Sequence, residues 1–196
     1  MIAIVDYGAG NLASVVKALR RLGHECTVTS NPDDVGQADK WIIPGVGSFK
    51  ATAPLANGKL GQLLRDSIAV DRPLLGICLG LQWMFEGSAE APEFKGLGAF
   101  SGNCERFSDR VKSPHVGWDS LEITIPSRLL QGIPTGSYVY FTHSYSAPVC
   151  PETVATYTYE APFTAAAERG NLFGVQFHPE KSGDVGMTVL ENFCAL

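Results

Sequence analysis

A cysteine between two glycines is the first feature of the sequence that could do chemistry. Cys78 stands within Gly76–Gly80 (GICLG), after an apolar run and before a segment with helical spacing. This pattern matches the G-x-nucleophile-x-G elbow, a tight turn that exposes one side chain at the carboxyl edge of a sheet. The helix amino terminus favours a thiolate there, and the backbone N–H of Leu79 would point toward an attacked carbonyl. The alternative is an ordinary buried cysteine, since so short a motif also arises by chance.

A nucleophilic thiol needs a base, and the chain contains four histidines. Only His178 has an acid placed to orient it. The proline that follows His178 forces extended geometry, so that Glu180, two positions on, lies on the same side of the chain. Glu180 can then hold the imidazole in the tautomer that accepts the proton of Cys78. Alone, the His-Pro-Glu run indicates a strand that ends in a proline turn with a solvated acid, but with the elbow it predicts a Cys-His-Glu triad.

A glycine-rich loop follows another apolar run. Pro44–Gly47 (PGVG) leaves the end of that run, where open α/β sheets place their ligands. Its glycines would let backbone N–H groups approach a carbonyl closely, so Gly45 or Val46 could complete an oxyanion hole with Leu79. By itself the loop indicates only a turn.

The segments that must position these residues alternate between strand and helix in the first half of the chain. Four apolar strands are predicted: Met1–Asp6, Glu25–Ser30, Lys40–Ile43 and Pro73–Ile77. Helical segments are predicted at Leu12–Leu22, with Asn11 as cap and Gly23 as stop, then up to about Ile68, and at Leu79–Glu86. The order strand, helix, strand is typical of a parallel crossover unit.

After Gly96 the pattern changes to short segments rich in β-branched and aromatic residues. Antiparallel or mixed strands are predicted at Gly117–Ile125, Ser137–Tyr145, Thr153–Tyr159, Phe163–Ala167 and Leu172–Phe177. A helix at Gly183–Leu196 closes the chain. The sequence therefore predicts an α/β fold of three layers, an open, mostly parallel sheet flanked by helices, with additional antiparallel strands in the second half. We expect residues 1–196 to form a single domain.

Composition argues against several classes of function. The 196 residues are 45% hydrophobic and 18% charged, as in ordinary globular proteins. The net charge of −5 comes without any basic run, which argues against nucleic acid or membrane lipid as partners. No stretch reaches the ~20 apolar residues that span a bilayer. Five cysteines lie far apart without a C-x-x-C pair, so neither disulfides nor a metal site is predicted, and a reducing, cytoplasmic setting is expected.

Two of these motifs together resemble a known family. Gly76–Gln82 (GICLGLQ) and Gly174–Lys181 (GVQFHPEK) are similar to the class I glutamine amidotransferases, whose triad is cysteine, histidine and glutamate. Five further stretches narrow the resemblance to the glutaminase subunits of imidazole glycerol phosphate synthases: Asp6–Leu12, Pro44–Phe49, His115–Trp118, Tyr140–Tyr145 and Lys181–Gly183. The resemblance runs from residue 2 to about residue 195.

This resemblance implies roles for individual residues. Cys78 would attack the side-chain amide of glutamine, His178 would protonate the departing ammonia, and water would release glutamate from a thioester. No cofactor is implied. Six residues would hold the glutamine: Gly47, Gln82, Glu90, His143, Ser144 and Tyr145. Without the resemblance, these positions read as polar residues beside the elbow helix and as the end of a strand.

The resemblance also implies a partner. In this family ammonia passes to a separate (β/α)8-barrel cyclase subunit, which makes imidazole glycerol phosphate and an aminoimidazole carboxamide ribotide. The triad face would dock on that barrel, with four contacts: Gly8, Asn11, Trp118 and Tyr140. The PGVG loop is expected to reorient its peptide before the oxyanion hole is complete. Two positions depart from the family pattern, Asp119 where asparagine is common and Ala89 where glutamate is frequent.

Three other functions stay open. A glutaminase could serve pyridoxal phosphate, purine, pyrimidine or anthranilate synthesis, although the HVGW and YFTHSY stretches argue against this. A noncatalytic relative could only bind and stabilise a partner, which the complete triad opposes. Finally, the His178-x-Glu180 spacing is half of a zinc deaminase signature, but the second half, Pro-Cys-x-x-Cys, is absent.

Overall fold

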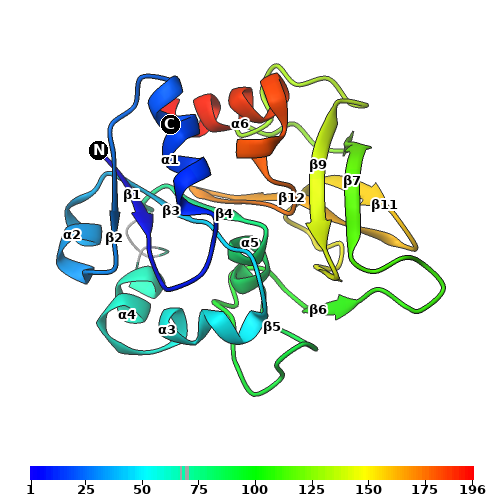
Figure 1. The fold of residues 1–196 in the computed structure, drawn as a ribbon, viewed down its shortest axis with the longest axis horizontal. Coiled ribbons are helices and arrows are strands. Elements are labelled where there is room, and N and C mark those ends of the chain that lie inside the picture. The colour runs from blue at the N-terminus through cyan, green and yellow to red at the C-terminus, as the bar shows by residue number, and fades with distance from the viewer. Residues whose placement is uncertain (67, 69–70) are drawn as a thin grey trace.

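An eight-stranded sheet forms the centre of the computed structural model, which describes residues 1–66, 68 and 71–196 (Figure 1). Its strands are, in spatial order, β2 (Cys26–Thr29), β1 (Ile2–Val5), β3 (Lys40–Ile43), β4 (Leu74–Ile77), β13 (Leu172–Val175), β12 (Pro162–Arg169), β11 (Thr153–Thr158) and β8 (Glu122–Ile123). The pairs from β2 to β13 are parallel, and those from β13 to β8 are antiparallel. The predicted combination of a parallel sheet with antiparallel strands from the second half is confirmed.

Helices cover both faces of this sheet (Figure 1). One face carries α1 (Leu12–Arg21) and α6 (Gly183–Ala195), and the other carries α2 (Pro32–Gln37), α3 (Ala53–Ala56), α4 (Gly58–Asp66) and α5 (Leu79–Met84). Strand β1 shows the cause, because Ile2 and Ile4 belong to the core under α1 and α6 while Ala3 and Val5 belong to the other core. A strand that is apolar on both sides needs a helical layer on each. The predicted three layers are therefore confirmed.

Helix α1 begins and ends where its sequence signals lie. The side chain of Asn11 accepts a hydrogen bond from the backbone N–H of Ser14 at 3.4 Å. After Arg21 the chain turns at Gly23, whose φ of +81° is a left-handed conformation that glycine adopts without steric cost. The predicted cap and the predicted stop are both found.

Some predicted elements have different bounds. The single strand expected at Gly117–Ile125 is divided into β7 (His115–Ser120) and β8, because the chain leaves one sheet for another at the buried Leu121. The strand expected at Ser137–Tyr145 is divided into β9 (Tyr138–His143) and β10 (Tyr145–Ser146).

The helical segment predicted up to about Ile68 is broken into short pieces. These pieces are the 3-10 turn Phe49–Thr52, α3 and α4. Helix α4 ends at Asp66, Ile68 lies in a turn, and residue 67 is outside the described residues. Four short elements among the described residues were not predicted: α2, β5 (Gly87–Ser88), β6 (Asn103–Arg106) and the 3-10 turn Pro179–Lys181. The two residues of β5 are too few to show a periodic pattern.

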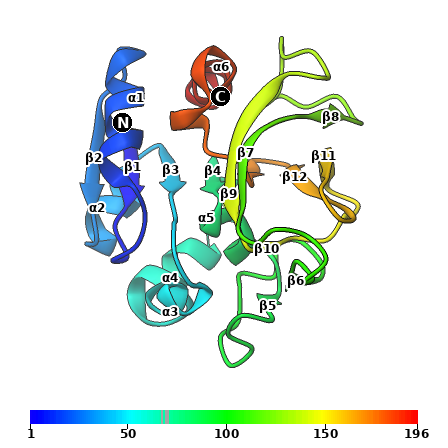
Figure 2. The ribbon, with the colours of Figure 1, turned by 45° about the vertical axis from the view of Figure 1, so that its right-hand side comes forward.

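Strands β7 and β9, which β8 separates along the chain, form an antiparallel pair next to the main sheet, and this pair is called the hairpin below (Figure 2). Trp118 pairs with Tyr140 in this hairpin, and His115 pairs with His143. The backbone N–H of His178, which follows β13, donates to the carbonyl of Tyr140 at 2.9 Å. The hairpin is thus fixed to the carboxyl edge of the parallel strands, where the chemically promising residues were predicted.

Candidate active site

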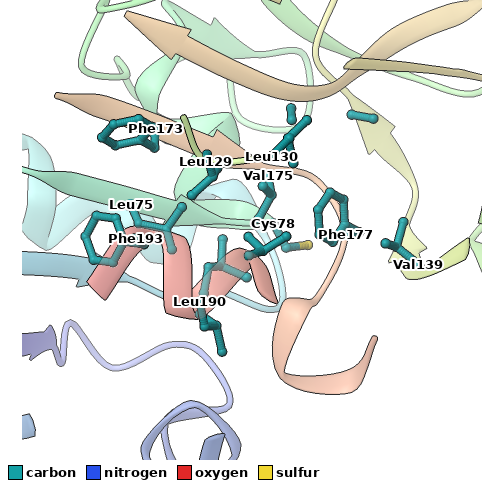
Figure 3. Close-up of a cluster of buried hydrophobic side chains, with 14 of the residues drawn as sticks. Leu75, Cys78, Leu129, Leu130, Val139, Phe173, Val175, Phe177, Leu190 and Phe193 are labelled. Atoms are coloured by element: carbon teal, nitrogen blue, oxygen red, sulfur yellow. The ribbon is translucent and has the colours of Figure 1, made fainter. Parts of the chain in front are cut away.

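Cys78 lies on a strained turn between β4 and α5. Its φ is 53° and its ψ is −104°, a combination that costs energy in any residue except glycine. Its backbone N–H donates to the carbonyl of Val175 at 2.7 Å, which extends the pairing of β4 with β13 by one residue. Figure 3 shows Cys78 within the apolar cluster that also contains Val175 and Phe177. The predicted elbow is present, and the sheet holds it in its strained form.

Glycines at two positions allow this turn to pack. A Cβ atom on Gly80 would lie 1.9 Å from the carbonyl oxygen of Ile43, and one on Gly76 would lie 2.6 Å from the carbonyl carbon of Gly80. Both obstacles are backbone atoms, which cannot move aside as a flexible side chain can. Close packing of the turn against these backbone atoms therefore requires glycine at both positions.

His178 and Glu180 reach the same edge because β13 is the parallel neighbour of β4. The register aligns Val175 with Ile77, so the residues that follow each strand lie close together. The His178 backbone is extended, with φ −102° and ψ 97°, as expected before a proline. Its Nδ1 lies 2.8 Å from Oε1 of Glu180, and the two side chains are only 1% and 2% exposed.

The hydrogen bond to Glu180 decides which ring nitrogen of His178 is free. A carboxylate can only accept, so Nδ1 carries the proton in this contact. The other nitrogen, Nε2, is buried and has no hydrogen-bond partner among the described residues. Burial lowers the pKa of His178, but interactions with Cys78 and Glu180 outweigh burial and raise it to about 9. Glu180 therefore leaves Nε2 as the ring nitrogen that is free to exchange a proton.

A cavity of about 530 Å³ opens beside Cys78, which is the size range of small-molecule sites. Its wall contains most of the residues predicted to form the oxyanion hole or to bind glutamine: Val46, Gly47, Leu79, Gln82, Glu90, His143, Ser144 and Tyr145. Gly45, His178 and Glu180 are not part of this wall. Pro114, Thr142 and Lys181 also line the cavity and were not predicted. Each of these lies in or directly beside a motif noted in the sequence, but spacing alone does not tell which positions face a cavity.

The PGVG loop turns a carbonyl toward the elbow. The backbone N–H of Leu79 donates to the carbonyl of Gly45 at 3.4 Å. Because the peptide between Gly45 and Val46 is planar and trans, the N–H of Val46 points the opposite way. In this conformation the N–H of Leu79, which was predicted to serve the oxyanion hole, is hydrogen-bonded to the carbonyl of Gly45.

Glu90 and the residues after the loop are joined directly. The backbone N–H of Phe49 donates to Oε2 of Glu90 at 2.6 Å. Glu90 thus fixes the segment that follows Gly47, whose φ is +105°. We infer from these contacts that Glu90 shapes this end of the cavity through the loop.

His143, in the wall of the cavity, and His115 belong to one aromatic cluster. Nδ1 of His143 lies 2.9 Å from the carbonyl of Tyr145, and burial lowers the pKa of His143 to about 3, so its ring is neutral near pH 7. Nε2 of His115 lies 2.7 Å from Asp119, which also accepts from the hydroxyl of Tyr157 at 2.8 Å. Asp119, a departure from the family pattern, has acceptor oxygens for both neighbours.

The four residues predicted to contact a partner do not share one environment. Asn11 caps α1, Gly8 is exposed, and Tyr140 is half-buried. Trp118 is 51% exposed and its ring meets that of Tyr140 edge to face, 6.0 Å between centroids. Two further exposed apolar residues of the hairpin were not predicted, Val116 and Tyr138. They lie on the same face as Trp118 and Tyr140 because strand residues two apart share a face.

Some kinds of site are not found in the described part of the chain. No group of three or more histidine, cysteine, aspartate or glutamate side chains there could hold a metal ion. No described helix combines the length and the apolar character needed to cross a bilayer.

The sequence of this chain matches a known protein family. Residues 3–196 match the family model for "Glutamine amidotransferase class-I". The chain belongs to this family. The resemblance inferred from the elbow and the His-Pro-Glu run is thereby confirmed, and the chain is a glutamine amidotransferase.

Relatives with identities of 44% to 46% show to which group within the family this chain belongs. Proteins named imidazole glycerol phosphate synthase subunit HisH are 44% identical in Bacillus cereus (strain B4264) and 46% identical in Moorella thermoacetica, each match covering 98% of this chain and 93% of the relative. The HisH subunit of Thermococcus kodakarensis is 46% identical, with 98% of both chains covered. Within the class-I glutamine amidotransferases, this chain therefore groups with the HisH glutaminases.

Solved structures support the fold. A crystal structure of a glutamine amidotransferase has a TM-score of 0.77 at 18% identity and covers 98% of both chains. PurLQS from Thermotoga maritima also has a TM-score of 0.77, at 19% identity, with 99% of this chain and 97% of that chain covered. At such identities the likeness concerns the fold alone, and it agrees with the predicted fold class.

Proposed function

We propose that this class-I glutamine amidotransferase hydrolyses glutamine through Cys78, His178 and Glu180, and passes the ammonia to the cyclase subunit of an imidazole glycerol phosphate synthase in histidine biosynthesis. The observation that carries the proposal is the buried His178–Glu180 pair, at 2.8 Å, whose imidazole pKa responds to Cys78 at the wall of the cavity. The HisH relatives favour this acceptor over those of other glutaminases.

The first half of the reaction releases ammonia. The thiolate of Cys78 attacks the amide carbon of glutamine and forms a tetrahedral intermediate with a negative oxygen. The protonated His178 gives its proton to the amide nitrogen, the carbon–nitrogen bond breaks, and ammonia leaves. A γ-glutamyl thioester stays on Cys78. The raised pKa of His178, about 9, keeps the ring protonated near neutral pH until this transfer.

The second half regenerates the enzyme. His178, now neutral, takes a proton from water, and the hydroxide attacks the thioester carbon. The carbon–sulfur bond breaks, glutamate leaves, and the thiolate of Cys78 returns. Glu180 holds the ring through Nδ1 in both halves, so that Nε2 is the nitrogen that exchanges protons.

The oxyanion hole forms when the loop peptide rotates. Rotation of the peptide between Gly45 and Val46 would withdraw the carbonyl from Leu79 and turn the N–H of Val46 toward the cavity. Two N–H groups would then face the negative oxygen of the intermediate. An enzyme that rests with this peptide turned away hydrolyses glutamine slowly, which fits a reaction that must not release ammonia without an acceptor.

The β7–β9 hairpin is the surface that we assign to the (β/α)8-barrel cyclase subunit. It exposes Val116, Trp118 and Tyr138, an apolar group of the kind found at protein interfaces. Tyr140 on the same face is bonded through its backbone to the turn that carries the base, since its N–H donates to Ser182 Oγ at 2.9 Å and its carbonyl accepts from His178. A partner that binds the hairpin would therefore contact Tyr140, whose backbone carbonyl is hydrogen-bonded directly to His178.

Glutamate release tests the proposed function. The chain alone is expected to hydrolyse glutamine slowly, and addition of the cyclase subunit with its nucleotide substrate is expected to raise the rate at least about tenfold. An enzyme-coupled glutamate assay measures both rates. No glutamate in either mixture would refute the glutaminase activity, and an equal rate in both would refute the coupling to this partner.

The docking surface is tested by Trp118→Ala. The truncation is expected to weaken binding of the cyclase subunit at least about tenfold, because a large exposed aromatic at the centre of an interface contributes much of its energy. Isothermal titration calorimetry measures the affinity. Val149→Ala is the matched control, since Val149 is equally exposed, at 51%, but lies outside the hairpin. Equal affinity of the two variants for the cyclase subunit would show that the hairpin is not part of the interface.

A further inference from the structure

We propose that Gln176 is a positioning residue for the nucleophile, with its amide N–H stabilising the thiolate of Cys78. The inference deepens the proposed glutaminase mechanism and rests on it for its functional meaning. Gln176 lies just after β13, two residues before His178, and is fully buried. A buried amide beside a reactive sulfur needs partners for both of its ends, and those partners determine what it does.

The hydrogen bonds of Gln176 form a chain across the active site. Its Nε2 donates to Sγ of Cys78 at 3.5 Å. Its Oε1 accepts from Nε2 of Gln82 at 3.1 Å, and the same Gln82 nitrogen donates to the carbonyl of Tyr145 at 2.7 Å. The chain therefore runs from a backbone carbonyl of the cavity wall, through two side-chain amides, to the sulfur.

The backbone carbonyl of Tyr145 at one end fixes the donor-to-acceptor direction of all three hydrogen bonds. The carbonyl of Tyr145 can only accept, so the NH2 end of Gln82 must face it. That NH2 group also reaches Gln176, which must then present its oxygen to Gln82. The NH2 end of Gln176 is left for Cys78. Reversing Gln82 would set its oxygen against the carbonyl of Tyr145, and reversing Gln176 would set two NH2 groups against each other in a buried place, so the sulfur meets a donor.

A donor at this place favours the charged form of the sulfur. Hydrogen bonds to an ionised acceptor are about twice as strong as those between neutral groups, so the amide of Gln176 stabilises thiolate more than thiol. The thiol has a different partner, because Sγ of Cys78 lies 4.0 Å from the carbonyl of Thr142. That contact is longer and available only while the proton is present. Gln176 thus stabilises the reactive thiolate form of Cys78 from a buried position.

The same series of hydrogen bonds determines which end of the Gln82 side chain faces a substrate. Since the NH2 group of Gln82 is used by Tyr145 and Gln176, its Oε1 is the end left for a ligand in the cavity that Gln82 lines. An acceptor there suits an N–H donor such as the amide or ammonium group of glutamine. Loss of Gln176 removes one of the two contacts that impose this orientation.

Alkylation of Cys78 by iodoacetamide tests the proposal, since the thiolate is the form that reacts. The rate is followed from pH 5 to pH 10, and the Cys78 peptide is quantified by mass spectrometry so that other cysteines do not contribute. In Gln176→Leu we expect the pH midpoint of alkylation to move upward and the rate at pH 7 to fall at least about tenfold. The near-isosteric Gln176→Glu is expected to move the midpoint further, because a carboxylate replaces the donor.

Two controls separate this role from simple packing. Thr164→Val changes an equally buried polar side chain of the same sheet and is expected to leave the midpoint unchanged. Gln176→Glu keeps the side-chain volume and serves if the leucine variant does not fold. The glutamine concentration that protects Cys78 from alkylation is also expected to rise in both Gln176 variants.

An alkylation profile of a folded Gln176 variant that superposes on that of the wild type would overturn the inference. The assay needs no turnover. A wild-type chain that released no glutamate would refute the proposed function. The effect of Gln176 on the alkylation of Cys78 would still be measurable in that case.

Discussion

Replacement of Cys78 by alanine is expected to reduce glutamine hydrolysis by at least about 10⁴-fold, since no other group can form the thioester. The rate of glutamate release in the presence of the cyclase subunit measures this loss. The fold is expected to stay intact, because alanine leaves the backbone of the elbow unchanged and removes one sulfur from a side chain that is 5% exposed. In the complex, synthesis from ammonium salts is expected to continue at the wild-type rate, because ammonia then needs no nucleophile.

Cys194→Ala is the matched control. Cys194 is also buried, at 9% exposed, but it lies in α6 and takes no part in the cavity. Its variant is expected to keep full glutaminase activity. Normal turnover by the Cys78 variant, or an equal loss in both variants, would contradict the assignment of the nucleophile.

Replacement of Glu180 by glutamine is expected to have the second largest effect, a fall in the rate constant of hydrolysis of about 10²- to 10⁴-fold. Glutamine can present an NH2 group to Nδ1 of His178, and the ring would then carry its proton on Nε2. Nε2, the nitrogen that must take a proton from water in the second half of the reaction, would then be blocked. Steady-state kinetics of glutamate release measure the effect, which should appear in kcat with little change in KM.

The same substitution has a second readout in the pH dependence of stability. In the folded protein the pKa of His178 is about 9, raised from 6.5. A raised pKa means that the extra stability is present in full below about pH 6.5 and is lost as the pH rises through about 9. Without the carboxylate of Glu180 the pKa of His178 falls, so this loss is expected to end at a lower pH. Urea unfolding from pH 6 to pH 10 measures it.

Glu168→Gln provides the control for both readouts. Glu168 is also largely buried, with 13% of its side chain exposed, and it pairs with Arg128 away from the cavity. Its variant is expected to keep the wild-type kcat and the wild-type change of stability between pH 6.5 and pH 9. A Glu180 variant that behaved like it would show that the carboxylate does not orient His178.

The fold, the elbow at Cys78 and the contact between His178 and Glu180 could be predicted because their causes are local. Cys78 needs a strand, a helix and two glycines, all within a few residues of it. Glu180 is tied to His178 by the geometry that one proline imposes. The parallel order of the strands then brings these two short segments to one edge, and a strand, helix, strand pattern is sufficient to expect it.

The rest of the site depends on contacts that sequence spacing does not contain. Gln176 was quoted only as part of a motif, because its partners Gln82 and Cys78 are 94 and 98 positions away. The direction of the Gly45 carbonyl is a rotation of one peptide, which leaves no trace in residue type. Likewise, division of the predicted strand at Gly117–Ile125 between two sheets could not be foreseen, since both halves have the same alternating pattern.

The parallel pairing of β4 with β13 also has a consequence for the chain as it is synthesised. The elbow with Cys78 emerges from the ribosome long before His178, and the backbone of Cys78 is held by Val175, which is made just as late. An unfinished chain thus has Cys78 without His178 and without the strand that maintains the strained turn. Under the proposed mechanism, a nascent polypeptide therefore releases no ammonia before β13 has been made and paired with β4.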